Sequence, residues 1–585
     1  MLNEHTNKTN SIIENVMTGY PSIDKPWLKY YKKRPKDLIY PHKTLYQFVY
    51  DNNIDYLNNI AFQYFDKQIS YNKFFENVNK AAKAFVDIGV KAGDIVTIMS
   101  MHTPETIYTV YGLNYIGAVA NLVYPTLTEN ELLQTLSNTE SKAFFVLDVI
   151  LEKSMINPDK ISIPIIVLPV DRSMPLPIKV GYMLKNAISQ NKKKCTRVIS
   201  YHDFIKKKSD IQNAVLALDS TTTAVIVYTS GTTGEPKGVM LSNDSLNCLA
   251  TQDYNGLLDF QRGKNSLLIL PPFIGFGISM LHVQLGAGIK SILQIVLEPE
   301  DIYKSLFRYK PYCYMTGPAL IENLLSHRPS DLSPLKYFLS GGGHVTEEQI
   351  FKVNTFLTEC GTKANFSNGY GMTEAGVVLC LACNEINKLG SVGIPFIDTN
   401  VKVVDIDSLE ELKYDKIGEL WFTCPNLMSG YYKNTKATNE VIFVDNTGTR
   451  WLRTGDLGHV DKDGFVFIDA RIKRIYITRG KDNMAYKLFP QQMEEIIKRV
   501  DEVDECGVIV HEDKTRINVG VVFVLPKDPM IYKEISEKDK LCNKLFDFAL
   551  SELPEHMQPT EIHIIDKMPI THSGKINYRE LEKMM

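Results

Sequence analysis

The stretch that most constrains this chain is residues 224–238, which read AVIVYTSGTTGEPKG. Its first five residues are apolar and mostly β-branched, which predicts a buried strand. A run of four hydroxyl residues and two glycines follows at once. Such a run exposes backbone N–H groups and adds side-chain donors, and Lys237 places a positive charge beside it. This combination suits a polyphosphate ligand. We expect a helix next, with Ser242 or Asn243 as its N-cap.

The composition of this loop leaves a second interpretation open. It does not follow the Walker pattern, because Gly231 and Lys237 are too close and no GK[ST] follows. A Ser/Thr/Gly surface loop would have the same composition. Further segments along the chain bear on the choice. They are residues 271–277 (PPFIGFG), 340–343 (SGGG), 368–374 (NGYGMTE), 453–458 (RTGDLG) and 569–576 (PITHSGKI).

Together with YTSGTTGEPKGVMLS, these segments in this order resemble the adenylate-forming superfamily. That group includes acyl-CoA and aryl-CoA synthetases, luciferases and peptide-synthetase adenylation domains. The likeness is to a free-standing acyl-CoA synthetase, and it covers roughly residues 45–585. It implies an ATP-dependent ligase that joins a carboxylic acid to AMP and then to the thiol of CoA, with Mg²⁺ on the phosphates.

The resemblance assigns roles to individual residues. Thr373 would contact the α-phosphate, Glu374 would help to hold Mg²⁺, and Lys575 would bridge the carboxylate and the α-phosphate after the domains close. A carboxylate suits a hard cation that bridges phosphate oxygens. The implied set that binds ATP or CoA is Thr229, Ser230, Gly231, Thr232, Thr233, Gly234, Lys237, Gly341, Gly342, Asn368, Gly369, Tyr370, Gly371, Asp456, Arg471, Lys473 and Gly480.

Within this set, Asp456 and Arg471 are expected at the ribose, Lys473 at the pivot between two domains, and Gly480 at the pantetheine tunnel. The stretch 480–490 is longer than the superfamily usually has, which puts the thiol-acceptor surface in question. The acyl pocket would be lined by Phe273, Ile274, Gly275 and Gly343.

Ile274 bears on the substrate class. Many members of the superfamily have histidine at this place, and amino-acid-activating members tend to have aspartate. Burying an ammonium group without a charged partner would be costly. The isoleucine therefore favours an apolar acid, and a fatty acid is the expectation. Core packing is the alternative explanation for these apolar residues.

The order of predicted elements indicates the fold class. Strands and helices alternate in the first part of the chain, which predicts parallel sheets covered by helices. After residue 396 short strands dominate, and a compact α+β tail follows residue 471. We expect an α/β protein with a large layered N-terminal domain (1–470) that includes a small β-rich subdomain, and a mobile α+β C-terminal domain (471–585).

Composition excludes some functions and suggests a location. The net charge of −3 gives no field that favours nucleic acid. Nine scattered cysteines indicate a reducing compartment, hence the cytoplasm, and Cys380 and Cys383 are expected as two packed thiols. No secretory signal or membrane span is expected. The basic block from Lys179 to Lys208 is either a solvated insertion or a peripheral membrane contact.

Alternatives to a CoA ligase remain at this stage. No carrier domain is expected after Lys575, which favours CoA as the acceptor, and a separate acyl carrier protein is the alternative acceptor. The chain could also stop at the adenylate, or bind nucleotide or acyl groups without catalysis. The presence of Thr373, Glu374, Asp456 and Lys575 argues against a non-catalytic relative.

Overall fold

The computed structural model describes residues 17–31, 38–176, 178–179, 198–206, 219–229, 236–295, 298–343, 345–572 and 575–585. Ser230, Gly231, Thr232, Thr233 and Gly234 of the predicted phosphate loop lie outside these residues, as does most of the basic block between Lys179 and Lys208. Within the described residues, no helix has the length and apolar character needed to cross a bilayer.

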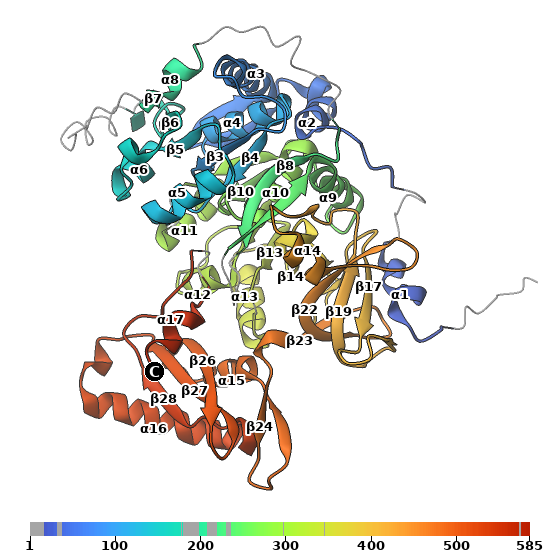
Figure 1. The fold of residues 1–585 in the computed structure, drawn as a ribbon, viewed down its shortest axis with the longest axis vertical. Coiled ribbons are helices and arrows are strands. Elements are labelled where there is room, and N and C mark those ends of the chain that lie inside the picture. The colour runs from blue at the N-terminus through green and yellow to red at the C-terminus, as the bar shows by residue number, and fades with distance from the viewer. Residues whose placement is uncertain are drawn as a thin grey trace, which may run out of the picture.

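Two large sheets form the body of the N-terminal domain (Figure 1). In the first sheet, the strands from β14 to β1 are parallel and the outer ones antiparallel. The order in this sheet is β16 (Ile394–Pro395), β15 (Cys380–Leu381), β14 (Phe366–Tyr370), β13 (Tyr337–Gly341), β12 (Cys313–Thr316), β10 (Asn265–Leu268), β11 (Lys290–Leu293), β1 (Ile60–Tyr64) and β2 (Lys67–Ser70).

The second sheet is parallel from β8 to β7, and β20 and β9 add an antiparallel edge. The order in this sheet is β20 (Gly430–Tyr431), β9 (Lys237–Ser242), β8 (Thr223–Thr229), β4 (Val119–Leu122), β3 (Ile95–Met99), β5 (Phe144–Leu147), β6 (Ile165–Leu168) and β7 (Val198–Ser200).

Helices fill the space between the two sheets and cover their outer faces. The largest hydrophobic core joins both sheets to the central helices α2 (Leu45–Asn53), α3 (Tyr71–Asp87), α4 (Pro104–Tyr115), α9 (Asn243–Asn255) and α10 (Gly275–Ala287). The outer faces pack on two further sets of helices, α5 (Glu129–Asn138) with α6 (Asp148–Lys153), and α11 (Pro299–Tyr309), α12 (Ile321–Leu325) and α13 (Glu347–Glu359). The result is a five-layered α/β body.

The expected helix is present, and a strand precedes it. Residues 237–242 form strand β9, which pairs antiparallel with β8. Val239 and Leu241 are buried on this strand, so its apolar residues are used in the sheet rather than on a helix face. The expected helix is α9, and Ser242 is its N-cap, accepting a hydrogen bond from the Ser245 backbone.

The β-rich subdomain contains one sheet whose described strand pairs are all antiparallel. Its strands are β18 (Glu411–Leu412), β17 (Asn400–Val404), β19 (Gly418–Thr423), β22 (Arg450–Val460), β21 (Ile442–Val444) and β23 (Val466–Arg471), with α14 (Thr435–Val441) beside them. Asp463 and Gly464 lie in the turn between β22 and β23, as the sequence predicts. The isolated thiols Cys380 and Cys383 are both buried, as expected.

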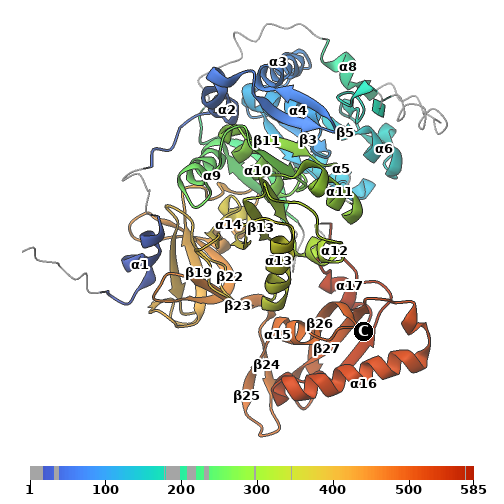
Figure 2. The ribbon, with the colours of Figure 1, turned by 180° about the vertical axis from the view of Figure 1, so that it is seen from behind.

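The C-terminal domain lies beneath the body in both views (Figures 1 and 2). It contains a sheet of β26 (Val503–Asp513), β27 (Ile517–Pro526) and β28 (Glu561–Ile564), covered by α15 (Pro490–Ile497), α16 (Ile535–Glu552) and α17 (Tyr578–Glu582). A hairpin of β24 (Tyr476–Arg479) and β25 (Ala485–Leu488) projects away from the body. This hairpin accounts for the long stretch 480–490 seen in the sequence.

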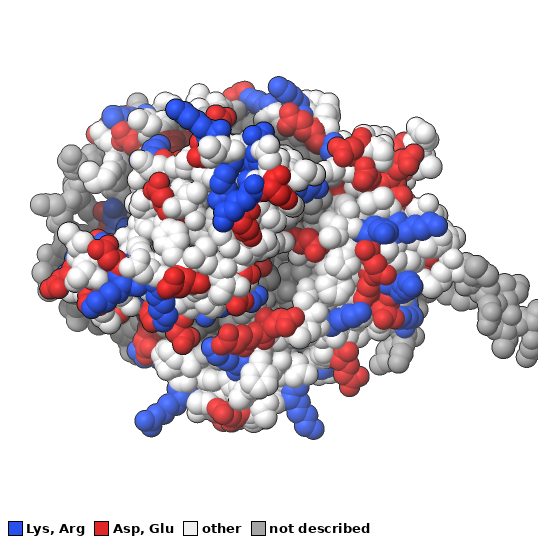
Figure 3. Space-filling model, turned by 90° about the horizontal axis from the view of Figure 1, so that it is seen from below, with Lys and Arg blue, Asp and Glu red and all other residues white. Residues whose placement is uncertain are grey.

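The lower surface of the molecule carries both signs of charge. Figure 3 shows Lys and Arg side chains interspersed with Asp and Glu over this face. A protein surface that binds nucleic acid needs a basic stripe or patch, and this face does not present one.

The segment before the first sheet is packed against the β-rich subdomain. Trp27, in the short helix η1 (Pro26–Tyr30), is only 1% exposed and joins the core that includes Val401 and Val466. Gly464 has φ +95°, and a Cβ at this position would lie 2.6 Å from the Trp27 backbone nitrogen. Only glycine allows this approach.

We predict that Trp27→Ala lowers the free energy of unfolding by about 3 to 5 kcal/mol, because it removes a large buried ring. Denaturant titration followed by circular dichroism would measure the loss. Lys29→Ala is the matched control, since its exposed ion pair with Asp463 (2.7 Å) contributes about 1 kcal/mol or less. Equal losses in the two variants would contradict the packing role of Trp27.

Candidate active site

The described ends of the predicted phosphate loop are fixed at one point on the second sheet. Thr229, the last residue of β8, is paired with Lys237, the first residue of β9. The Lys237 ammonium lies 5.0 Å from the centre of the Tyr431 ring on the neighbouring strand β20. The two described ends of this segment are therefore paired with each other, and Lys237 lies against an aromatic face.

Glu374 lies next to this support. It belongs to the short helix η5 (Thr373–Ala375) after β14 and is buried. The Tyr431 hydroxyl donates to Glu374 Oε1 at 2.7 Å. Tyr431 therefore contacts both the predicted metal-binding carboxylate and the ammonium of Lys237. Tyr431 could not be selected from the sequence, because its role depends on a contact across 57 residues.

Glu374 fits a magnesium site of the type that the resemblance implies. One of its oxygens accepts from Tyr431, which leaves the other for a cation. In the described part of the chain, no three His, Cys, Asp or Glu residues gather as a metal cluster. Mg²⁺ commonly uses one or two carboxylates together with substrate phosphates rather than an all-protein cage. A single oriented carboxylate suits that arrangement.

The carboxyl ends of β12, β13 and β14 meet at one sheet edge, where the glycine-rich segments lie. Ser340 is paired with Asn368, and Gly341 with Gly369. Ser340 Oγ and Asn368 Oδ1 are buried and have no hydrogen-bond partner among the described residues. Buried polar atoms normally have partners, so these two atoms suit a polar ligand such as a nucleotide base.

Asp456 is the most buried charged residue of the predicted set, at 1% exposed. Arg471 Nε lies 2.6 Å from its Oδ1, and the Tyr370 hydroxyl donates to its Oδ2 at 2.5 Å. Burial raises the pKa of the Asp456 carboxyl, and Arg471 opposes this effect, followed by Tyr370 and Lys575. Carboxylate oxygens hold further lone pairs, so Asp456 can still accept from ribose hydroxyls.

A second carboxylate, which sequence reasoning missed, shapes the turn that carries Asp456. Glu419 is buried and accepts from Arg453 Nη2 at 3.0 Å and from the Gly455 backbone N–H at 3.1 Å. Gly455 has φ +69°, a conformation that favours glycine. The ion pair and the glycine together stabilise the turn that carries Asp456. The contact depends on the pairing of β19 with β22, which joins residues far apart in the sequence.

Lys575 reaches the same place from the C-terminal domain. The chain near the C-terminus rises from that domain toward the body (Figure 1). The Lys575 ammonium has its pKa lowered by desolvation and by Arg471, while Glu374 and Asp456 oppose the shift. Its surroundings thus include groups from η5, β22 and β23, although the residue as a whole keeps contact with solvent. Lys575 is therefore near enough to Glu374, Asp456 and Arg471 for their charges to affect its pKa.

One of the predicted acyl-pocket residues, Gly275, lies beside Thr373. A Cβ on Gly275 would lie 2.8 Å from Thr373 Cγ2, so the glycine permits direct contact between the two motifs. Phe273 is buried and packs edge-on against Tyr124 at 5.2 Å. Gly343 lies across from Pro318, which a Cβ would approach to 3.1 Å, and Gly342 has φ +88°.

Two residues near the domain boundary differ in their placement. Lys473 lies in the short helix η6 (Ile472–Arg474), directly after Arg471 and Ile472. Gly480 lies at the turn of the β24–β25 hairpin, where a Cβ would meet the Tyr486 ring at 2.8 Å. In this arrangement the structure does not bring Gly480 to the phosphate residues, and its place at a pantetheine tunnel stays a prediction. Gly371 packs tightly against Val377, and its part in nucleotide binding also stays a prediction.

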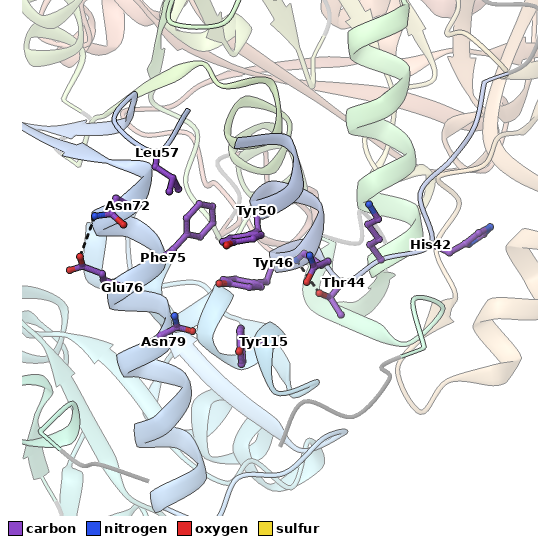
Figure 4. A pocket seen from close by; sticks show the side chains of 12 residues that line it. His42, Thr44, Tyr46, Tyr50, Leu57, Asn72, Phe75, Glu76, Asn79 and Tyr115 are labelled. Carbon is purple, nitrogen blue, oxygen red and sulfur yellow. Dashed lines mark hydrogen bonds between the residues drawn. The ribbon is translucent and has the colours of Figure 1, made fainter. Parts of the chain in front are cut away.

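One cavity adjoins this site, and a second lies among helices outside the predicted motifs. One, of about 550 Å³, lies between the domains and is lined by Asn368 and Thr346 from the body and by Lys498 and Arg499 from the C-terminal domain. The other, of about 620 Å³, lies between α2, α3 and α4 (Figure 4). Its walls include four aromatic rings, and none of its lining residues belongs to the predicted motifs.

Comparison with known proteins decides the family. The AMP-binding enzyme family matches residues 52–432, and the AMP-binding enzyme C-terminal domain matches residues 492–575. The chain belongs to the AMP-binding enzyme family. The superfamily predicted from the motifs is thereby confirmed.

Individual members of the family resemble the chain over nearly its whole length. The long-chain-fatty-acid–CoA ligase of Bacillus subtilis is 27% identical over 571 residues, which is 95% of this chain and 97% of the relative. The 2-succinylbenzoate–CoA ligase of Bacillus cytotoxicus is 24% identical, with 90% and 96% covered. A solved structure of o-succinylbenzoate coenzyme A synthetase from Bacillus subtilis, with ATP and magnesium ion, has TM-score 0.72 at 21% identity, with 93% and 100% covered. This agreement confirms the predicted fold class.

Tyr431 gives a testable consequence for this AMP-binding enzyme. Tyr431→Phe removes the hydroxyl that orients Glu374 but keeps the ring beneath Lys237. If Glu374 holds Mg²⁺, the Mg²⁺ concentration for half-maximal ATP–pyrophosphate exchange should rise roughly tenfold to a hundredfold, as is typical when a ligand loses its orienting partner. Tyr432→Phe, at the neighbouring and more exposed tyrosine, is the matched control. An unchanged Mg²⁺ dependence in Tyr431→Phe would remove Tyr431 from the site.

Proposed function

We propose that this chain activates a fatty acid as its adenylate and transfers the acyl group to CoA. The chain is an AMP-forming acid–thiol ligase that uses ATP, Mg²⁺ and CoA. The observation that carries the proposal is that the loop of Lys575 contacts the N-terminal domain (His572 Nδ1 to Thr126 Oγ1, 2.7 Å). There the charges of Glu374 and Asp456 act on the Lys575 ammonium. A mobile cation beside buried carboxylates suits a reaction that gathers negative phosphates and a carboxylate.

The first half-reaction joins the acid to AMP. A carboxylate oxygen of the acid attacks the α-phosphorus of ATP, the bond between the α- and β-phosphates breaks, and pyrophosphate leaves with that electron pair. We assign Lys575 to the attacking carboxylate and the α-phosphate, and Thr373 to the α-phosphate oxygens. Mg²⁺, held by Glu374, would neutralise charge on the phosphates. Asp456 and Arg471 would bind the ribose, and residues 229–237 the leaving pyrophosphate.

The second half-reaction passes the acyl group to sulfur. The CoA thiolate attacks the acyl carbon, the bond from that carbon to the phosphate oxygen breaks, and AMP leaves. The relatives reported above are named CoA ligases, which supports CoA over an acyl carrier protein as the acceptor. We propose that the domains span 1–470 and 471–585. Lys473 would be the pivot about which the C-terminal domain turns between the two half-reactions.

The fatty-acid assignment is supported by two observations. The loop expected to line the pocket presents Phe273 and Ile274 rather than a charged group, and both pack with the main core. The Bacillus subtilis long-chain-fatty-acid–CoA ligase is among the similar proteins. An apolar chain gains about 0.8 kcal/mol for each methylene that leaves water, so such a pocket favours longer aliphatic acids.

ATP–pyrophosphate exchange with a panel of acids tests the proposal. The panel comprises acetate, octanoate, palmitate, 4-coumarate and 2-succinylbenzoate. We expect palmitate to exceed the aryl acids at least tenfold in kcat/KM, which corresponds to about 1.4 kcal/mol of discrimination. Thioester formation would then be assayed with CoA and with a holo acyl carrier protein, and CoA should be the acceptor.

Two different results would contradict the proposal. Exchange that depends on none of the acids, with Mg²⁺ present, would contradict the ligase activity itself. Best exchange with 4-coumarate or 2-succinylbenzoate would retain the activity and overturn the fatty-acid assignment.

A further inference from the structure

The loop that carries Lys575 touches the N-terminal domain through a second residue, His572. Its Nδ1 lies 2.7 Å from the hydroxyl oxygen of Thr126, and its Nε2 lies 3.6 Å from Glu131 Oε1. Its ring lies nearly parallel to the Tyr124 ring, with 6.1 Å between centres and 25° between planes. Three residues of the body therefore contact one imidazole from the other domain.

The three receiving residues are themselves held in place. Glu131 belongs to the capping box of α5, where its Oε2 accepts from the Thr128 backbone N–H at 2.7 Å. This contact leaves Oε1 directed at a fixed position toward His572. Thr126 lies in the short connection between β4 and α5. Glu131, which faces His572, is thus oriented by a contact within the N-terminal domain.

Tyr124 connects this surface to the reaction site. Its hydroxyl donates to the Tyr228 backbone oxygen at 2.9 Å, one residue before the end of β8 and the phosphate loop. Its ring also contacts Phe273 of the predicted acyl pocket. One tyrosine therefore contacts the support of the phosphate loop, the acyl-pocket loop and the imidazole of His572.

His572 and Lys575 are linked by a short closed loop. The Thr571 backbone N–H donates to the Lys575 carbonyl at 2.7 Å, and Ile570 pairs with Ile576 across its base. Fixing the imidazole therefore restricts the position of the Lys575 backbone. A lysine side chain is long and flexible, and restricting its base increases the fraction of time that the ammonium spends near the phosphates.

We infer that His572 is a positioning residue that docks the Lys575 loop onto Tyr124, Thr126 and Glu131 for adenylate formation alone. The inference rests on the proposed ligase function, since it assigns His572 to one of the two half-reactions. His572 would not contact the reacting atoms. Its contribution should vanish in thioester formation, because the C-terminal domain then no longer presents Lys575 to the phosphates.

His572→Ala tests this role by separating the half-reactions. We expect kcat of palmitate-dependent ATP–pyrophosphate exchange to fall about tenfold or more, while thioester formation from supplied palmitoyl-adenylate and CoA stays within twofold of wild type. His511→Ala in the same domain is the control, since the His511 imidazole hydrogen-bonds to the carbonyl of Glu512 in its own strand. Thermal melting should not distinguish the variants.

Further variants distinguish docking from a passive surface contact. His572→Asn keeps a polar atom near the Nδ1 position and should recover part of the exchange activity. Thr126→Val should act like His572→Ala. The double variant should be no slower than the slower single variant, because both remove the same interaction. Multiplying effects would show that the Thr126 contact does not carry the docking.

A structural readout makes the inference independent of turnover. Small-angle scattering with a non-hydrolysable ATP analogue should show a larger radius of gyration for His572→Ala than for wild type and for His511→Ala. If the wild-type protein shows no acid-dependent exchange, the proposed function is contradicted. The scattering comparison would still test whether His572 docks the Lys575 loop onto the N-terminal domain. Exchange in His572→Ala within twofold of an active wild type, equal losses in both half-reactions, or unchanged scattering would overturn the inference.

Discussion

The candidate active site contains buried carboxylates, which need partners, and several parts of the structure supply those partners. Removing a charged carboxylate from water is costly unless it is paired and hydrogen-bonded. Glu374 obtains a tyrosine hydroxyl from β20, and Asp456 obtains Arg471 and Tyr370. These partners come from two sheets and the β-rich subdomain, so the site exists only when all three are assembled. The cation from the C-terminal domain completes the set, which links domain closure to the charge balance of the site.

Features that depend on neighbouring residues in the chain could be predicted from the sequence. A β-branched run before a glycine- and hydroxyl-rich loop indicated β8, and the Asp463-Gly464 pair indicated the turn between β22 and β23. The motif order led to the family, which the comparisons confirm. The helix expected with Ser242 as its N-cap is α9, but strand β9 before it was not predicted, because Val239 and Leu241 pair with β8. Local propensity did not reveal which partner these residues would have.

Long-range contacts explain what the sequence could not provide. Tyr431 acts on a carboxylate 57 positions away, Glu419 on a turn 34 to 36 positions away, and His572 on a threonine 446 positions away. Trp27 packs in a subdomain whose strands begin near residue 400. No spacing rule connects such residues, because the fold alone brings them together. The individual roles assigned to the predicted nucleotide-binding residues remain proposals.

Two arginines mark the change from one domain to the next. Arg471 is tied to Asp456 of the body, whereas Arg474 forms a fork with Glu494 at 2.8 and 3.0 Å and also donates to Val508 of the C-terminal domain. Any reorientation that keeps both pairs must be absorbed by the backbone torsions of Ile472 and Lys473. The two half-reactions can therefore differ by a swivel at a single joint, with the interior of each domain unchanged.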